Sequence, residues 1–108
     1  ERVPGVVLRA HFHNTRGTGI ANAWAAWQAG VTILDSSLAG LGGCPFAPGA
    51  TGNIATEDLA YMMARSGIPS HLDLDKLIAL AGWVEGVLGR KVPSSVAQAG
   101  NFTGLPPR

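Results

Sequence analysis

The chain has 108 residues, of which 46% are hydrophobic and 14% charged, and its net charge of +1 gives no electrostatic case for binding nucleic acid or a membrane surface. No apolar run approaches the roughly 20 residues that span a bilayer, and the first residues do not resemble a secretory signal. A single cysteine excludes an internal disulfide, and we therefore expect a soluble, cytoplasmic protein with one modest domain.

Strand and helix patterns alternate along the first half of the chain. Residues 6–13 form a β-rich run, residues 18–28 follow a helical period, and residues 31–37 form the next β-rich run. A long glycine-rich loop then covers residues 39–51. We interpret residues 52–55 as a third, short strand.

The second half of the sequence predicts two helices and a tail. Thr56 is the expected cap of the first helix, whose first turn carries Glu57 and Asp58, where the helix dipole favours acidic side chains. The last helix is predicted over residues 74–88. Residues 93–108 are expected to form a loose tail.

Side chains that could bind a metal or take part in a reaction lie at the carboxyl ends of the predicted strands. Alternating strands and helices with apolar strands predict a parallel sheet, whose strand ends share one edge. His11 and His13 end the first strand, and Asn53 lies in the third. Two histidines two residues apart on a strand face the same side, and with an amide oxygen they suit a divalent ion. The alternative is one histidine packed in the core and one in solvent.

Cys44 lies in the glycine-rich loop and has three interpretations. It is a small buried hydrophobic residue, a nucleophile paired with a histidine, or a thiol displayed on a mobile loop. The glycines of residues 40–43 lack the lysine and hydroxyl residue of a phosphate-binding loop, which argues against a nucleotide site.

Residues 35–46 resemble the signature of the 3-hydroxy-3-methylglutaryl-CoA lyase family. That signature reads Ser-Val-Ala-Gly-Leu-Gly-Gly-Cys-Pro-Tyr, and here Leu38 and Phe46 replace its valine and tyrosine. The resemblance extends to further segments: residues 11–13, 49–53, 55–58, 90–91 and 96–99.

This resemblance implies an α/β fold, the C-terminal part of a (β/α)8 TIM barrel. A complete barrel needs about 250 residues, so residues 1–108 would supply about three of its eight βα units, with association into a homodimer or higher oligomer. In the family, the residues matching His11, His13 and Asn53 hold a divalent metal, usually Mg²⁺ or Mn²⁺.

The resemblance also implies a reaction. The complete enzyme would cleave 3-hydroxy-3-methylglutaryl-CoA, or a close 3-hydroxyacyl-CoA, into acetyl-CoA and acetoacetate by retro-Claisen cleavage, and residues 1–108 alone would be inactive. Cys44 and His11 would transfer protons, and Lys91 would contact the phosphates of CoA. Asn14 and Arg16 stand where many relatives carry aspartate and tyrosine in the pocket wall, so the accepted acyl group could differ from methylglutaryl.

Two other functions remain compatible with the sequence. One is a non-catalytic half-barrel that binds metal or pairs with another chain. The other is a related Claisen-type synthase, but such enzymes usually carry Asn-Gly-Ile-Gly-Glu where this chain has residues 39–44. The cysteine loop therefore favours the lyase.

Overall fold

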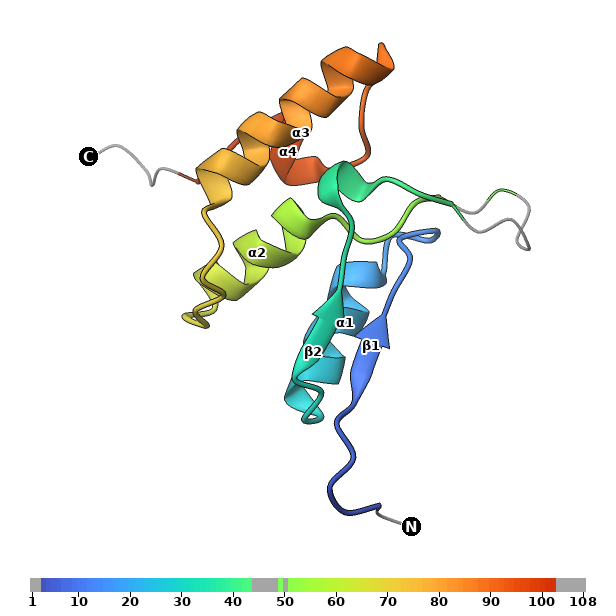
Figure 1. The fold of residues 1–108 in the computed structure, drawn as a ribbon, viewed down its shortest axis with the longest axis vertical. Helices are drawn as coiled ribbons and strands as arrows, with labels where there is room; N and C mark the ends of the chain where they lie inside the picture. Colours follow the sequence, from blue (N-terminus) through green and yellow to red (C-terminus); the bar gives the residue numbers. More distant parts are fainter. Residues whose placement is uncertain (1–2, 44–48, 50, 103–108) are drawn as a thin grey trace.

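A two-stranded parallel sheet occupies one end of the molecule. The computed structural model describes residues 3–43, 49 and 51–102. Strands β1 (Arg9–His11) and β2 (Ile33–Asp35) lie side by side and are joined by helix α1 (Gly19–Gln28), which lies beside them (Figure 1). His11 lies opposite Asp35 in the register of this pair. The predicted pair of adjacent parallel strands joined by a helix is confirmed.

Both strands are shorter than the β-rich runs of the sequence. Val6, Val7 and Leu8 precede β1 as exposed residues, and three residue pairs make up the whole ladder. A strand is defined by its pairing, so an extended segment without a neighbouring strand does not continue it.

The expected third strand, residues 52–55, appears as two isolated bridges. Asn53 pairs antiparallel with His13, and Ala55 pairs parallel with Ser37. Between them the Ile54 N–H donates to the Phe12 carbonyl, and the Ile54 carbonyl accepts from Ser37 N–H. The segment thus changes partner at Ile54 and connects the ends of the two strands instead of extending one ladder.

In the described part of the chain, four helical segments follow β2. A 3₁₀ turn, η1 (Leu38–Gly40), precedes α2 (Thr56–Arg65), and α3 (Leu74–Leu88) has the predicted bounds. The expected cap by Thr56 is wrong: Ala55 occupies the cap position, and the Thr56 hydroxyl is hydrogen-bonded to that of Ser36 over 2.8 Å.

A short helix, α4 (Ser95–Ala99), replaces the first part of the expected loose tail. Ser94 is fully buried, and its hydroxyl donates to the carboxyl group of Asp58 over 3.0 Å. The Ser95 and Val96 N–H groups donate to the same carboxyl group. The expectation is wrong here because Asp58 on α2 holds the start of α4; residues 103–108 lie outside the described part.

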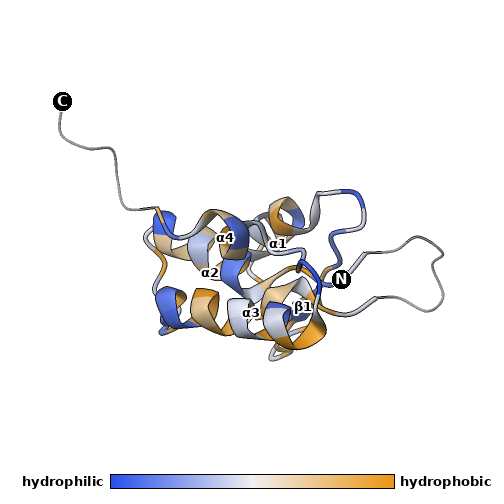
Figure 2. Ribbon diagram, turned by 90° about the horizontal axis from the view of Figure 1, so that it is seen from above, coloured by the Kyte–Doolittle hydropathy of each residue, from blue (hydrophilic) through white to orange (hydrophobic). Residues whose placement is uncertain are grey.

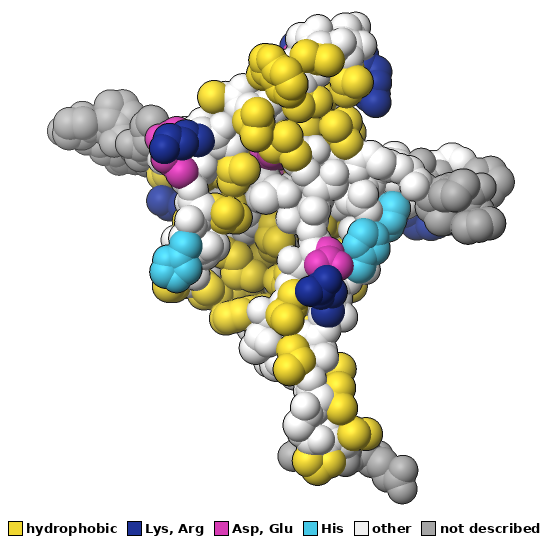
Figure 3. All heavy atoms as spheres, viewed as in Figure 1, with side chains coloured by type: hydrophobic (Ala, Val, Ile, Leu, Met, Phe, Trp, Pro, Cys, Tyr) yellow, Lys and Arg dark blue, Asp and Glu magenta, His cyan; other side chains and the backbone are white. Residues whose placement is uncertain are grey.

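Among the described residues, buried apolar side chains form two small clusters. One cluster lies between α1 and α2 and contains Ala23, Ile54, Leu59 and Met63. The other contains Ala39 of η1, Ala81 of α3 and Val92. Apolar residues also reach the outer surface of α3, where Trp83 is 65% exposed (Figures 2 and 3). None of the helices in the described ranges has the length and apolarity that a membrane span requires.

Candidate functional site

The two histidines form a compact pair at the end of β1. Their ring centroids lie 5.2 Å apart, with the ring planes inclined at 70°. His11 is exposed and His13 half-buried, and histidine side chains reach the surface on the face in Figure 3. This juxtaposition is the one expected from the two-residue period of an extended chain.

A main-chain carbonyl orients the ring of His13. Its Nδ1 lies 3.3 Å from the carbonyl oxygen of Thr51. Since a carbonyl only accepts hydrogen bonds, Nδ1 carries the proton in this contact, and Nε2 of the neutral ring keeps its lone pair. Metal-binding histidines commonly make this kind of contact, which fixes both ring orientation and tautomer.

Asn53 faces His13 across the antiparallel bridge. The bridge is flanked by hydrogen bonds from Asn14 N–H to the Gly52 carbonyl and from Ile54 N–H to the Phe12 carbonyl, both 3.1 Å long. This pattern makes His13 and Asn53 a non-hydrogen-bonded pair, in which opposing side chains share one side and approach closely. The fold thus brings Asn53 to the histidine pair.

The amide of Asn53 has a fixed orientation and one unused acceptor. Its Nδ2 donates to the Leu41 carbonyl over 2.9 Å, and its buried Oδ1 finds no hydrogen-bond partner among the described residues. A buried acceptor left unpaired costs about 1–3 kcal/mol. A cation satisfies an amide oxygen, and together with two imidazoles this oxygen suits a hard or borderline divalent ion. The residues present therefore fit the metal that the resemblance implies.

Two glycines allow the loop to lie directly against Asn53. A Cβ atom at Gly42, where φ is +99°, would lie 2.7 Å from Asn53 Nδ2. A Cβ at Gly52 would overlap the Gly40 carbonyl. The glycines of this segment thus permit the contact between the Leu41 carbonyl and Asn53.

Two further site residues are predicted from the sequence, Cys44 and Lys91. Cys44 lies outside the described residues. Lys91 is exposed and donates to Glu85 over 3.0 Å, and this hydrogen bond, together with that from Val92 N–H, lowers the pKa of the Glu85 carboxyl group. The roles of Cys44 in proton transfer and of Lys91 in CoA binding stay predictions.

Acidic ligands are also missing from the described part of the cluster. No group of three or more His, Cys, Asp or Glu side chains within the described ranges is arranged to hold a metal ion. Asp35, which is paired with His11 in the sheet, has Arg9 at 3.7 Å. The described chain thus offers two imidazoles and one amide oxygen.

Sequence reasoning missed the contacts that support this cluster. Glu57 is fully buried, and both of its carboxyl oxygens accept from the Ala39 N–H at 3.1 Å. The Leu41 carbonyl that orients Asn53 is a main-chain atom, which no residue pattern identifies. In the sequence, the one visible signal is the pair of acidic residues in the first turn of α2, which the helix dipole alone is enough to explain.

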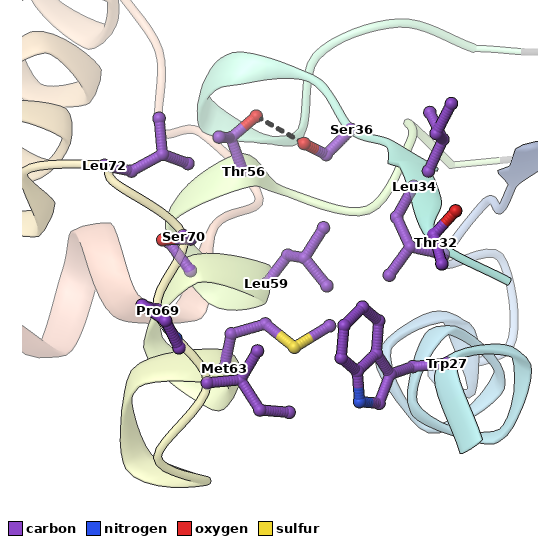
Figure 4. A pocket seen from close by; sticks show the side chains of 13 residues that line it. Trp27, Thr32, Leu34, Ser36, Thr56, Leu59, Met63, Pro69, Ser70 and Leu72 are labelled. Atoms are coloured by element: carbon purple, nitrogen blue, oxygen red, sulfur yellow. Dashed lines mark hydrogen bonds between the residues drawn. The ribbon is translucent and has the colours of Figure 1, made fainter. Parts of the chain in front are cut away.

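An apolar hollow of about 350 Å³ lies away from the histidines. It opens between α1, β2 and α2, where the side chains of Trp27, Leu59 and Met63 point toward one another, with the Ser36–Thr56 hydrogen bond at its rim (Figure 4). Neither histidine nor Asn53 lines it. The hollow and the His–Asn cluster are therefore separate features.

Comparison with known proteins gives a consistent result. The model of the HMGL-like family matches residues 1–84. The chain is 51% identical to the (R)-citramalyl-CoA lyase of Chloroflexus aurantiacus over 93% of its own length and 32% of that protein. It is 47% identical to a hydroxymethylglutaryl-CoA lyase of Bacillus subtilis, over 86% of this chain and 31% of that one.

Solved structures agree with these sequence comparisons. An HMG-CoA lyase from Acinetobacter baumannii, solved in complex with coenzyme A and 3-methylmalate, superimposes with a TM-score of 0.86 at 52% identity. The match covers 94% of this chain and 33% of that structure. The chain thus spans about a third of the length of the relatives that it matches.

Proposed function

The chain belongs to the HMGL-like family, and from this premise we propose that it supplies the metal-binding edge of a lyase that cleaves a 3-hydroxyacyl-CoA thioester. The observation that carries the proposal is the buried Oδ1 of Asn53, which has no hydrogen-bond partner among the described residues and belongs to a residue bridged to His13 of the histidine pair. A non-catalytic half-barrel that binds metal or pairs with another chain is the weaker candidate, because the relatives at 51% and 47% identity are named as lyases.

We propose that the chain forms about three βα units of a (β/α)8 barrel. In such barrels the active site lies at the carboxyl ends of the strands. His11 ends β1, and Asn53 lies in the segment that connects the ends of both strands. The parallel pair β1–β2 with its connecting helix α1 supports the same arrangement.

His11, His13 and Asn53 would hold the metal, Mg²⁺ or Mn²⁺. When bound, a divalent ion here would lower the free energy of a substrate alkoxide and orient the hydroxyl and carboxylate groups of the substrate. On the protein side, the Thr51 carbonyl keeps His13 Nε2 available, and the Leu41 carbonyl keeps Asn53 Oδ1 available.

The reaction needs two proton transfers. A base takes the proton of the tertiary hydroxyl group, the bond between the second and third carbons of the acyl chain breaks, and its electron pair forms the enolate of acetyl-CoA. An acid then protonates that enolate. The two proposed proton carriers are His11 and Cys44. His11 is exposed at the end of β1, and Cys44 is proposed on the resemblance alone.

The acyl group has two candidates. The 51% identity with a (R)-citramalyl-CoA lyase favours a shorter acyl chain than methylglutaryl as the second substrate to test. A difference of one methylene in the substrate changes kcat/KM by about 10–200-fold in a pocket shaped for one of the two. Asn14, which stands where many relatives carry aspartate, accepts a hydrogen bond from the Gly19 N–H at the start of α1 over 3.1 Å. The Asn14 side chain is therefore used in the turn before α1. Arg16 is the better candidate for a residue that selects between the two acyl groups.

The test is a cleavage assay with the complete polypeptide that carries this sequence. Both thioesters are supplied with saturating Mg²⁺ or Mn²⁺, and acetyl-CoA release is measured. The proposal expects metal-dependent acetyl-CoA release from at least one of them. Release from neither, by a folded protein that binds Mn²⁺, would contradict it. The cytoplasmic location stays a prediction, since hydroxymethylglutaryl-CoA lyases named as mitochondrial are among the relatives.

A further inference from the structure

We propose that Glu57 is a positioning residue for the metal site: through the 3₁₀ turn it determines which end of the Asn53 amide faces the histidine pair. The inference rests on the proposed metal site and adds a residue that touches neither metal nor substrate. Four linked observations carry it, from the buried carboxyl group to the unpaired amide oxygen.

The first observation is the environment of Glu57. Its side chain is 0% exposed, and both carboxyl oxygens accept from a single donor, the Ala39 N–H. No basic side chain pairs with it in the described ranges. Burying a carboxyl group is costly, and a neutral side chain of the same size would fill the space at lower cost. A purely packing role therefore does not explain an acid here.

The second observation is the backbone that the acid holds. Ala39 has φ of 60° and ψ of 6°, the left-handed region that residues with a Cβ atom disfavour. Its N–H is held by Glu57, and its carbonyl accepts from the Ser94 N–H over 3.2 Å. Both polar groups of this residue are thus fixed from outside the turn, which maintains its strained conformation.

The third and fourth observations connect the turn to the site. Leu41 follows η1, and its carbonyl accepts from Nδ2 of Asn53 over 2.9 Å. An amide has a donor end and an acceptor end, so fixing Nδ2 on this carbonyl leaves Oδ1 as the other end. If the turn shifts, the amide can rotate and present its NH₂ group, which cannot bind a cation.

The test measures Mn²⁺ affinity of the complete polypeptide without substrate, by titration calorimetry or by the EPR signal of free Mn²⁺. Glu57→Ala is expected to raise the Kd for Mn²⁺ by about 10–100-fold, the usual effect of losing a residue that orients a ligand. Glu57→Gln keeps one acceptor for the Ala39 N–H and is expected to restore most of the affinity.

The Glu57→Ala substitution in an Asn53→Asp protein distinguishes a positioning role of Glu57 from a general effect on folding stability. Aspartate presents two equivalent oxygens, so an Asn53→Asp protein has no amide to orient. Glu57→Ala is therefore expected to change the Kd by less than about three-fold in the Asn53→Asp background. Leu59→Ala, a core truncation on the same helix α2, is the matched control: it is expected to lower Tm and leave the Kd within about two-fold.

The outcomes distinguish the two proposals. If Asn53→Ala leaves Mn²⁺ affinity unchanged, or the parent protein binds no Mn²⁺, the proposed metal site is wrong, and the role of Glu57 falls with it. If Asn53→Ala weakens binding but Glu57→Ala does not, the metal site stands and the positioning role is wrong. An equal effect of Glu57→Ala in the Asn53 and Asn53→Asp backgrounds also overturns positioning, because the loss would then not depend on the amide.

Discussion

His11 and Asn53 reach the same candidate site from two regions that are built differently. The histidine arm, residues 6–13, pairs with β2 and, at its end, with the segment around Asn53, and it leaves Val7 69% exposed. The asparagine frame, residues 38–41 and 52–58, surrounds a fully buried acid and contains Ile54, which is 1% exposed. In the arm, the register with β2 places His11, and the contact of Nδ1 with the Thr51 carbonyl orients His13. In the frame, hydrogen bonds between segments distant in the sequence place Asn53.

This difference predicts where mutations act. In the arm, a change at His11 is expected to affect chemistry more than folding, because its side chain is exposed. In the frame, a change affects both, because Ile54 connects the two strand ends and packs in the core between α1 and α2.

The largest expected effect is on turnover. His11→Ala should lose both metal affinity and activity, because the residue is proposed to bind the ion and to carry a proton. Cys44→Ala should lower kcat by about 10²–10⁴-fold, roughly 3–5 kcal/mol of barrier, and leave the Kd for Mn²⁺ unchanged. Metal titration measures the Kd for Mn²⁺ of each variant, and thioester cleavage at saturating metal measures its kcat. Loss of metal binding in Cys44→Ala would make the thiol a ligand and contradict this assignment.

The next effect concerns stability and separates the two regions directly. Ile54→Ala should lower the free energy of unfolding by about 2–5 kcal/mol, because it empties a fully buried position. In the 108-residue chain, Val7→Ala should cost less than about 0.5 kcal/mol, because Val7 is exposed there. Urea unfolding of the two variants measures the difference. Similar costs for both would mean that the arm is packed as tightly as the frame.

A smaller and more local effect is expected at the junction of α2 and α4. Asp58→Ala removes the acceptor for the Ser94 hydroxyl and for two N–H groups at the start of α4. The loss of these bonds should cost about 1–3 kcal/mol. Amide hydrogen exchange should accelerate over residues 95–99 and stay unchanged in α1. Unchanged exchange at α4 would show that other contacts hold this helix.

The smallest effect is a pH dependence at the end of α3. Lys91 and the Val92 N–H lower the pKa of Glu85 from 4.5, so their contribution to stability is present above that pH and is lost as pH falls through the lowered pKa. Lys91→Met should raise the pKa of Glu85 toward its ordinary value, as followed by NMR titration of the Glu85 carboxyl carbon. An unchanged pKa would mean that the Val92 N–H alone lowers it.

The same division explains what the sequence could predict. The strand pair, the bounds of α3 and the histidine pair follow from local periods of 2 and 3.6 residues, which can be counted along the chain. Helix α4 depends on Asp58, a partner 36 residues before Ser94, and the turn at Ala39 depends on Glu57, 18 residues away. The sequence shows which hydrogen bonds or charges a polar residue can offer, but only the fold determines which distant residue it contacts.

We propose that Asn53 Oδ1 and the two histidines bind one divalent ion. Anomalous diffraction from crystals of the complete polypeptide grown with Mn²⁺ would locate this ion. One ion is expected at bonding distance, about 2.1 Å, from a ring nitrogen of His11, from Nε2 of His13 and from Oδ1 of Asn53, with Asn53 Nδ2 still donating to the Leu41 carbonyl. An ion bound elsewhere, or an ion bound to the histidines with Asn53 Oδ1 remote from it, would overturn the proposed site.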